Sequence, residues 1–260
     1  MRRQKEEASV TGPRPDSAGE SAVSVDLPLV TPAPRVWSPA TAVIVPAAAG
    51  LTFALLTIWV AGQGSAVSGV DEHVHSWVIS HRSPGSVAFA RAVTWGGVTT
   101  VVLPALVAVG AVAARRGRDI RRSLGSGLLL FCIAGVGIYV ETRINVLIGR
   151  GRPPVADWAG VAGGSAFPSG HTTAATLFAA LCAWAIAARV PAGWPRRGVW
   201  AGAVAYAAAV GWSRVWLGVH WPTDVVGGWL FGVAWFAGSV AVILTLRRRS
   251  ADRRAARSNA

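Results

Sequence analysis

The sequence reads GRGRPP at residues 149–154, FPSGHTT at 167–173 and SRVWLGVHWPTD at 213–224, and these three polar clusters lie between long apolar runs. Together they supply cations, imidazoles, a hydroxyl and a carboxylate, the groups that hold and attack an anionic phosphate. The side chains concerned are Arg150, Arg152, Ser169, His171, Arg214, His220 and Asp224. The clusters therefore predict a phosphate site at the ends of apolar segments.

The composition is that of an integral membrane protein. Hydrophobic residues make up 52% of the 260 residues, in long runs, and this content exceeds what a soluble core of this size needs. The formal net charge is +13, from 25 cationic and 12 acidic residues. The cations form short clusters beside apolar runs, which favours topology signals and anionic headgroups over nucleic acid. Cys132 and Cys182 fall inside apolar runs and are interpreted as buried thiols.

The apolar runs predict six membrane spans in an all-α bundle. Residues 1–38 are polar and predict a disordered cytoplasmic tail, residues 39–246 a membrane domain, and residues 247–260 a basic cytoplasmic tail. The expected spans cover residues 40–61, 92–114, 124–140 with a helical continuation toward 148, 170–188, 198–212 and 225–246.

The connector at residues 62–91 contains three histidines, His73, His75 and His81, which invite a metal-site interpretation. Apolar residues at helical spacing in the same stretch favour a short interfacial amphipathic helix instead. We expect no metal site here.

Arginine clusters set the expected topology. The links at residues 115–122 and 189–197 and the C-terminal tail are arginine-rich, which predicts a cytoplasmic position for each of them. They alternate with the connectors 62–91, 149–169 and 213–224. With six spans, both termini lie in the cytoplasm and the two chemistry-bearing connectors lie on the extracytoplasmic face of the cell membrane.

His220 and Asp224 are four residues apart, and Pro222 between them suits the first turn of a helix rather than its interior. We expect the last span to begin here, so that Asp224 reaches the His220 ring. A carboxylate on one ring nitrogen fixes the tautomer and leaves the other nitrogen available as a nucleophile or base. Simple capping of the helix explains this pair equally well when it is considered alone.

The other two clusters predict anion binding. Ser169 precedes a helix start and is expected to be its N-cap, Gly170 allows close approach of a ligand to the backbone, and His171 lies beside the first N–H groups of the helix. Arg150 and Arg152 match phosphate oxygens with rigid guanidinium groups. A juxtamembrane basic patch is the alternative, although the positive-inside rule predicts few arginines on an outer face.

Together the clusters resemble the signature of the type 2 phosphatidic acid phosphatase family, which shares its fold with vanadium-dependent haloperoxidases. The family pattern is Lys-x6-Arg-Pro, Pro-Ser-Gly-His and Ser-Arg-x5-His-x3-Asp. The second and third motifs match throughout, at residues 168–171 and 213–224, and Arg152 with Pro153 matches the end of the first. Asn145 stands where the family has lysine. The resemblance implies six spans around an acid phosphatase-like core.

The resemblance also implies residue roles. His220 attacks phosphorus and becomes a phosphohistidine, Asp224 orients it, and His171 protonates the leaving oxygen. Arg152, Arg214, Ser169 and Gly170 hold the phosphate oxygens, without metal or cofactor. For the lysine position we expect Asn145 to give a hydrogen bond and Arg150 to supply the missing charge, because Arg143 points elsewhere on the helix.

The predicted function is hydrolysis of a lipid phosphate or diphosphate at the membrane. Isoprenoid diphosphates such as undecaprenyl diphosphate, phosphatidate and phosphatidylglycerol phosphate all remain open as substrates, and the sequence does not indicate an oligomeric state. A weakened family member that binds lipid or serves a structural role is the alternative, because Asn145 replaces the lysine. A haloperoxidase-like enzyme is a third, disfavoured by the six predicted spans.

Overall fold

The chain is helical wherever the structure describes it. The computed structural model describes residues 39–64, 66–114 and 120–258, and within these ranges it contains eight α-helices, two 3-10 helices and no strand. The elements are α1 (Pro39–Gly62), α2 (Gly69–His81), α3 (Pro84–Thr94), η1 (Trp95–Gly97), α4 (Thr99–Ala114), α5 (Ile120–Ile148), η2 (Val155–Asp157), α6 (Gly170–Ala187), α7 (Trp194–Trp216) and α8 (Pro222–Ser258). The predicted all-α membrane class is confirmed.

Of the six spans that the sequence predicted, the structure supports four or five. In the described part of the chain, α1, α5, α6 and α8 are long and apolar enough to cross a membrane, and the bent pair formed by α3, η1 and α4 counts as a fifth span. The sixth expected span falls on α7. Its 23 residues give a length of about 35 Å, but it carries Arg196, Arg197 and Arg214 and is less apolar. A sixth span therefore stays a prediction.

The second expected span, residues 92–114, is broken rather than continuous. Helices α3 and α4 meet at an angle of 55° around η1, where two glycines let neighbouring segments approach closely. A Cβ atom on Gly97 would lie 2.7 Å from the His171 carbonyl oxygen, and one on Gly96 would lie 2.5 Å from the Tyr206 hydroxyl. The break therefore packs η1 directly against the start of α6.

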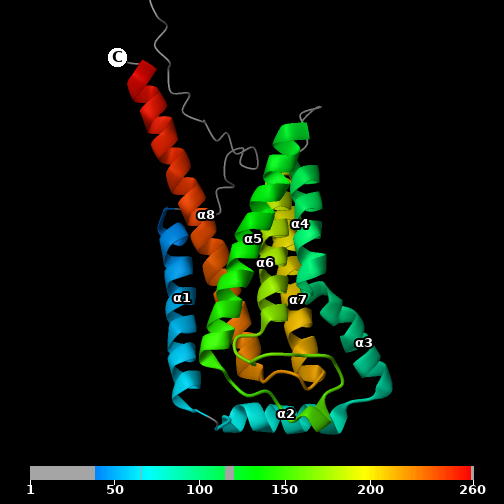
Figure 1. Cartoon of the computed structure of the whole chain (residues 1–260). Helices are drawn as coiled ribbons and strands as arrows, with labels where there is room; N and C mark the ends of the chain where they lie inside the picture. Colours follow the sequence, from blue (N-terminus) through cyan, green and yellow to red (C-terminus); the bar gives the residue numbers. More distant parts are fainter. Residues whose placement is uncertain (1–38, 65, 115–119, 259–260) are drawn as a thin grey trace, which may run out of the picture.

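The polar connectors lie together at one end of the bundle. Figure 1 shows α2 lying across this end, next to the loops that join α5 to α6 and α7 to α8, while the C-terminus lies at the opposite end. Hydrogen bonds join these segments: Ala159 N donates to Leu217 O at 2.9 Å, and Arg150 Nη2 donates to Asp71 Oδ2 at 2.7 Å. The short helix predicted in the 62–91 connector is α2.

Helix α6 is the centre of the bundle. Most of its residues are buried, and Leu177, Leu181 and Trp184 pack in a core with Leu130 of α5 and Phe236 of α8. By contrast, α1 exposes a succession of large apolar side chains, which suits a helix that faces lipid. Those side chains are Val43, Ile44, Leu51, Leu55 and Ile58.

Glycines bring α8 unusually close to α6. A Cβ atom on Gly228 would lie 2.8 Å from Ser169 O and 2.8 Å from Thr172 Cβ, and one on Gly232 would lie 2.7 Å from Thr176 Cβ. Small residues at such positions let membrane helices pack backbone to backbone. The close packing fixes the start of α6 relative to the first turns of α8.

The two predicted tails have different outcomes. Residues 1–38, where a disordered tail was expected, lie outside the described residues. The basic tail expected at residues 247–260 is largely helical, because α8 continues to Ser258. Three of the arginines expected in the 115–122 link, Arg115, Arg116 and Arg118, also lie outside the described residues.

Candidate active site

The His220 and Asp224 side chains meet at the start of α8. The helix begins at Pro222, as the sequence predicted, and both side chains are buried. His220 Nδ1 lies 3.3 Å from Asp224 Oδ2, which also accepts a hydrogen bond from Trp221 N at 2.8 Å. Because a carboxylate accepts hydrogen bonds, Nδ1 carries the ring hydrogen and Nε2 presents its lone pair.

The other ring nitrogen faces Arg152. Arg152 Nη1 donates to His220 Nε2 at 2.8 Å and to Val219 O at 2.7 Å. The other guanidinium nitrogens donate to the backbone carbonyls of Gly163, Gly164 and Ser165. The pKa of His220 is lowered to about 4, chiefly by burial and also by the charges of Arg152 and Arg214, while Asp224 opposes the shift. The imidazole is therefore neutral near pH 7, as a nucleophile requires.

Ser169 occupies the N-cap position of α6, but its side chain does not cap the helix. Its hydroxyl instead accepts a hydrogen bond from Thr172 Oγ1 at 3.0 Å. Ser169 N donates to Asp224 O at 3.0 Å, so the second motif is hydrogen-bonded to the third through the backbone. The first turn of α6 thus begins beside the His220–Asp224 pair.

Arg214 lies in the last turn of α7 and is buried. Its Nη1 donates to Thr94 Oγ1 at 2.8 Å and its Nη2 to Val161 O at 3.2 Å. Its Nε is buried without a hydrogen-bond partner among the described residues. A buried donor without a partner is costly, so this nitrogen is suited to donate a hydrogen bond to an anionic ligand.

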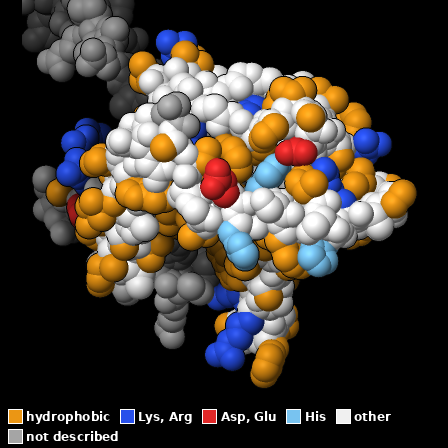
Figure 2. All heavy atoms as spheres, turned by 90° about the horizontal axis from the view of Figure 1, so that it is seen from below, with side chains coloured by type: hydrophobic (Ala, Val, Ile, Leu, Met, Phe, Trp, Pro, Cys, Tyr) orange, Lys and Arg blue, Asp and Glu red, His pale blue; other side chains and the backbone are white. Residues whose placement is uncertain are grey.

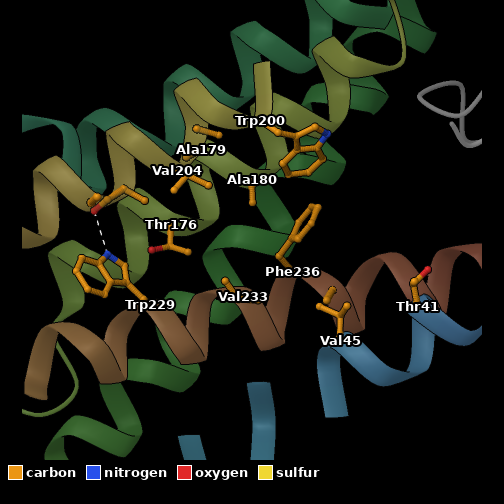
Figure 3. A pocket seen from close by; sticks show the side chains of 14 residues that line it. Thr41, Val45, Thr176, Ala179, Ala180, Trp200, Val204, Trp229, Val233 and Phe236 are labelled. Carbon is orange, nitrogen blue, oxygen red and sulfur yellow. Dashed lines mark hydrogen bonds between the residues drawn. The ribbon is translucent and has the colours of Figure 1, made fainter. Parts of the chain in front are cut away.

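Two cavities among the described residues differ in their lining, and one of them contains charged side chains. A cavity of about 480 Å³ is lined by Arg91, Thr94, Trp95, His171 and Arg214, together with the loop at residues 158–161. The larger one, about 620 Å³, is lined by apolar side chains and two threonines from α1, α6, α7 and α8. Figure 3 shows Trp229 at one end of this larger cavity and Thr41 and Val45 of α1 toward the other.

Arg150 does not take the position that the sequence suggested. We expected it to replace the missing lysine as a phosphate ligand. Instead its Nη1 donates to Asp224 Oδ1 and to Thr223 Oγ1, both at 2.6 Å, and its Nη2 donates to Asp71 Oδ2 at 2.7 Å. Its charge is compensated by two buried carboxylates, so its geometry favours positioning the dyad over binding a phosphate.

Asp71 is an acidic residue that the sequence analysis missed. It lies on α2, is fully buried, and accepts hydrogen bonds from Arg150 and from Thr223 N at 2.9 Å. A signal was available, because Asp71 falls at helical spacing with His75 and Val78 on the buried face of α2. Only the tertiary structure reveals that its partner is Arg150.

Asn145 braces the loop before α6 through its side-chain amide. Its Nδ2 donates to Ser165 O and to Pro168 O, both at 3.1 Å. Glu141, one turn earlier on α5, is buried and faces Gly170, where a Cβ atom would lie 3.4 Å from Glu141 Oε2. The sequence analysis did not single out Glu141, because the sequence does not indicate that this acidic residue lies against Gly170 in the folded protein. Arg143 is exposed.

The histidines of α2 have separate positions. His75 Nε2 lies 3.0 Å from Asp157 Oδ2, and His73 and His81 are exposed. Among the residues that the structure describes, no group of three His, Cys, Asp or Glu side chains is placed to hold a metal ion. Figure 2 shows this end of the molecule, where histidine, acidic and basic side chains lie among apolar ones.

Comparisons with known proteins agree on one family. A sequence model of the PAP2 superfamily matches residues 125–248. Phosphatidylglycerophosphatase B of Bacillus subtilis is 30% identical over 173 residues, which cover 66% of this chain and 82% of that protein. An undecaprenyl-diphosphatase of Sulfolobus acidocaldarius is 37% identical over 71 residues, 25% of this chain and 28% of that protein.

A solved structure has the same fold. The transmembrane PAP2 type phosphatidylglycerolphosphate phosphatase from Bacillus subtilis superposes with a TM-score of 0.68 at 25% identity, covering 78% of this chain and 96% of that one. The range matched by the family model, residues 125–248, includes all three polar clusters.

Proposed function

Because this chain belongs to the PAP2 superfamily, we propose that it is a membrane phosphatase that hydrolyses the phosphomonoester or diphosphate of a lipid through a phosphohistidine intermediate. The observation that carries the proposal is the neutral, buried His220. Asp224 holds its Nδ1 and its Nε2 faces Arg152, and the buried Nε of Arg214 has no hydrogen-bond partner in the part of the chain that the structure describes. The known relatives named above are lipid phosphatases.

The proposed first step is attack by His220 Nε2 on phosphorus. Asp224 keeps the hydrogen on Nδ1 and stabilises the charge that develops on the ring. Arg152 and Arg214, with Ser169 and the backbone N–H of Gly170, hold the phosphate oxygens as charge shifts in the transition state. Because Arg152 occupies the Nε2 lone pair in the structure, the incoming phosphate has to take its place there.

His171 is the proposed proton donor to the leaving oxygen. It lines the same cavity as Arg214, so a group leaving from phosphorus exits past it. Water then attacks the phosphohistidine, the nitrogen–phosphorus bond breaks, and inorganic phosphate leaves the regenerated imidazole. His171 takes the proton of that water in this second step.

We propose that the site opens on the extracytoplasmic face of the cell membrane, with both termini in the cytoplasm. The support is charge. Arg189, Arg196 and Arg197 follow α6, and a further run of arginines ends α8, both at the end of the bundle opposite α2. The positive-inside rule puts that end in the cytoplasm.

The experiment is phosphate release from a panel of lipid phosphates in detergent micelles, with His220→Gln as the matched variant. We expect release by the parent protein, loss in the variant, and an acid-labile phosphoenzyme that the variant does not form. A parent protein that releases no phosphate from any lipid would favour the lipid-binding alternative. Release that persists in His220→Gln would overturn the role of His220.

A further inference from the structure

We propose that Arg91 binds the lipid-linked phosphate of a diphosphate substrate, so that this site is built for lipid diphosphates rather than monophosphates. The inference rests on the proposed function and specifies its substrate class. It starts from the 480 Å³ cavity, in which Arg91 of α3 lies with His171 and Arg214 although none of the motifs contains it.

Arg91 and Arg214 hold the same loop from two sides. Arg91 Nε donates to Ala159 O at 2.7 Å, and Arg214 Nη2 donates to Val161 O at 3.2 Å. Arg214 Nη1 donates to Thr94, which is three residues after Arg91 and so lies on the same face of α3. The two guanidinium groups therefore line neighbouring parts of one cavity.

The two Nη groups of Arg91 have no hydrogen-bond partner among the described residues, and the side chain is exposed. An arginine at this end of a span also runs against the positive-inside rule. A buried Arg150 at the same end is explained by Asp71 and Asp224, whereas no described acidic side chain pairs with Arg91. The free Nη groups of Arg91 suit a second phosphate at the cavity, because guanidinium groups match phosphate oxygens with two parallel donors.

The terminal phosphate of a diphosphate occupies the position beside His220, Arg152 and Arg214. The next phosphate shares one oxygen with it and lies further out in the cavity, on the side of His171 and Arg91. His220 Nε2 forms a bond to the terminal phosphorus while the bond to the bridging oxygen breaks. The lipid monophosphate leaves with that oxygen and the proton from His171. Arg91 neutralises the charge that accumulates on this leaving phosphate.

The test compares two substrates that share one tail, farnesyl diphosphate and farnesyl monophosphate, in detergent micelles. We expect Arg91→Gln to lower kcat/KM for the diphosphate about ten-fold, the loss typical of one charge-assisted hydrogen bond, and to change the monophosphate value by less than about two-fold. Arg91→Lys keeps the charge and should lie between parent and Arg91→Gln. The ratio of the two values does not depend on how much of a preparation is folded.

Arg82→Gln is the matched control. Arg82 Nη1 donates to Asp157 O at 2.7 Å on the same connector, but the side chain does not line the cavity. We expect it to change both substrates alike. Equal losses for both substrates in Arg91→Gln, or no loss, would overturn the inference and reduce Arg91 to a brace for the loop. A parent protein inactive on both substrates would instead overturn the proposed function.

Discussion

Replacing Arg150 with methionine tests the buried ion pairs behind His220, the proposed nucleophile. The guanidinium lies 2.6 Å from Asp224 Oδ1 and 2.7 Å from Asp71 Oδ2, and all three side chains are buried. Methionine keeps most of the length and removes the charge, which leaves two carboxylates buried without a cation. Loss of one partner from a buried ion pair costs about 3–5 kcal/mol. In a protein of this size that corresponds to a Tm lower by about 10 °C.

The expected kinetic effect is on turnover. Asp224 Oδ1 loses the hydrogen bond that Arg150 donates, and the carboxylate then orients the His220 ring less firmly. We therefore expect kcat to fall while KM for the lipid stays close to the parent value. The assay is thermal unfolding of the purified protein together with kcat and KM for phosphate release. Arg143→Met is the matched control, because Arg143 lies on α5 and is exposed; it should leave both measurements near those of the parent.

Asp71→Asn refines the test. Asparagine still accepts a hydrogen bond from Thr223 N but removes one of the two charges around Arg150. We expect a smaller loss of stability than in Arg150→Met, and a coupling energy of about 1–3 kcal/mol between the two positions in a double-mutant cycle. An unchanged Tm with a raised KM in Arg150→Met would refute this reasoning, because it would identify Arg150 as a phosphate ligand after all.

Three further predictions concern protonation, metals and topology. Burial lowers the pKa of His220 from its usual 6.5 to about 4, so the neutral nucleophile persists in mild acid and the acid limb of kcat/KM that belongs to His220 should lie near pH 4. The lowered pKa also contributes to the free energy of unfolding, fully above pH 6.5, and this contribution is lost as the pH falls through about 4. The stability of His220→Gln should therefore depend less on pH between these values. An equal pH dependence in the variant and the parent would contradict the assignment. Activity should survive chelators and fall with vanadate, a mimic of the pentavalent phosphoryl transition state, whereas loss in EDTA that magnesium restores would refute metal independence. In a background without Cys132 and Cys182, Glu72→Cys on α2 should label with an impermeant reagent from outside the cell and Arg118→Cys should not, and the reverse pattern would end the topology proposal.

The features predictable from the sequence are those that depend on near neighbours. The i, i+4 spacing of His220 and Asp224 around Pro222 predicts their meeting, because one helical turn brings the two side chains together. The start of α6 at Gly170 and the short helix α2 follow from equally local patterns. The apolar runs likewise predict α1, α5, α6 and α8.

The features that were missed depend on contacts between distant segments. Arg150 was expected to supply the missing charge at the phosphate because it lies beyond the end of its helix and is free to fold back, but its guanidinium pairs with Asp224 and with Asp71, 79 residues away. Ser169 was expected to cap α6, yet its hydroxyl pairs with Thr172 instead. The break at η1 was missed because a run of apolar residues does not show where another helix, here α6, packs against it.

The glycines at which α8 meets α6 restrict which residues the chain tolerates at positions outside the proposed phosphate site. A single methyl group at Gly228 or Gly232 would push α8 away from Ser169, Thr172 and Thr176. That displacement would separate His171 from His220, because His171 lies in the first turn of α6 and His220 lies in the turn just before α8. In a saturation mutagenesis library these two positions should therefore tolerate as little variation as the histidines. A map of intolerant positions would follow the α6–α8 seam deep into the bundle, well beyond the reach of any substrate headgroup.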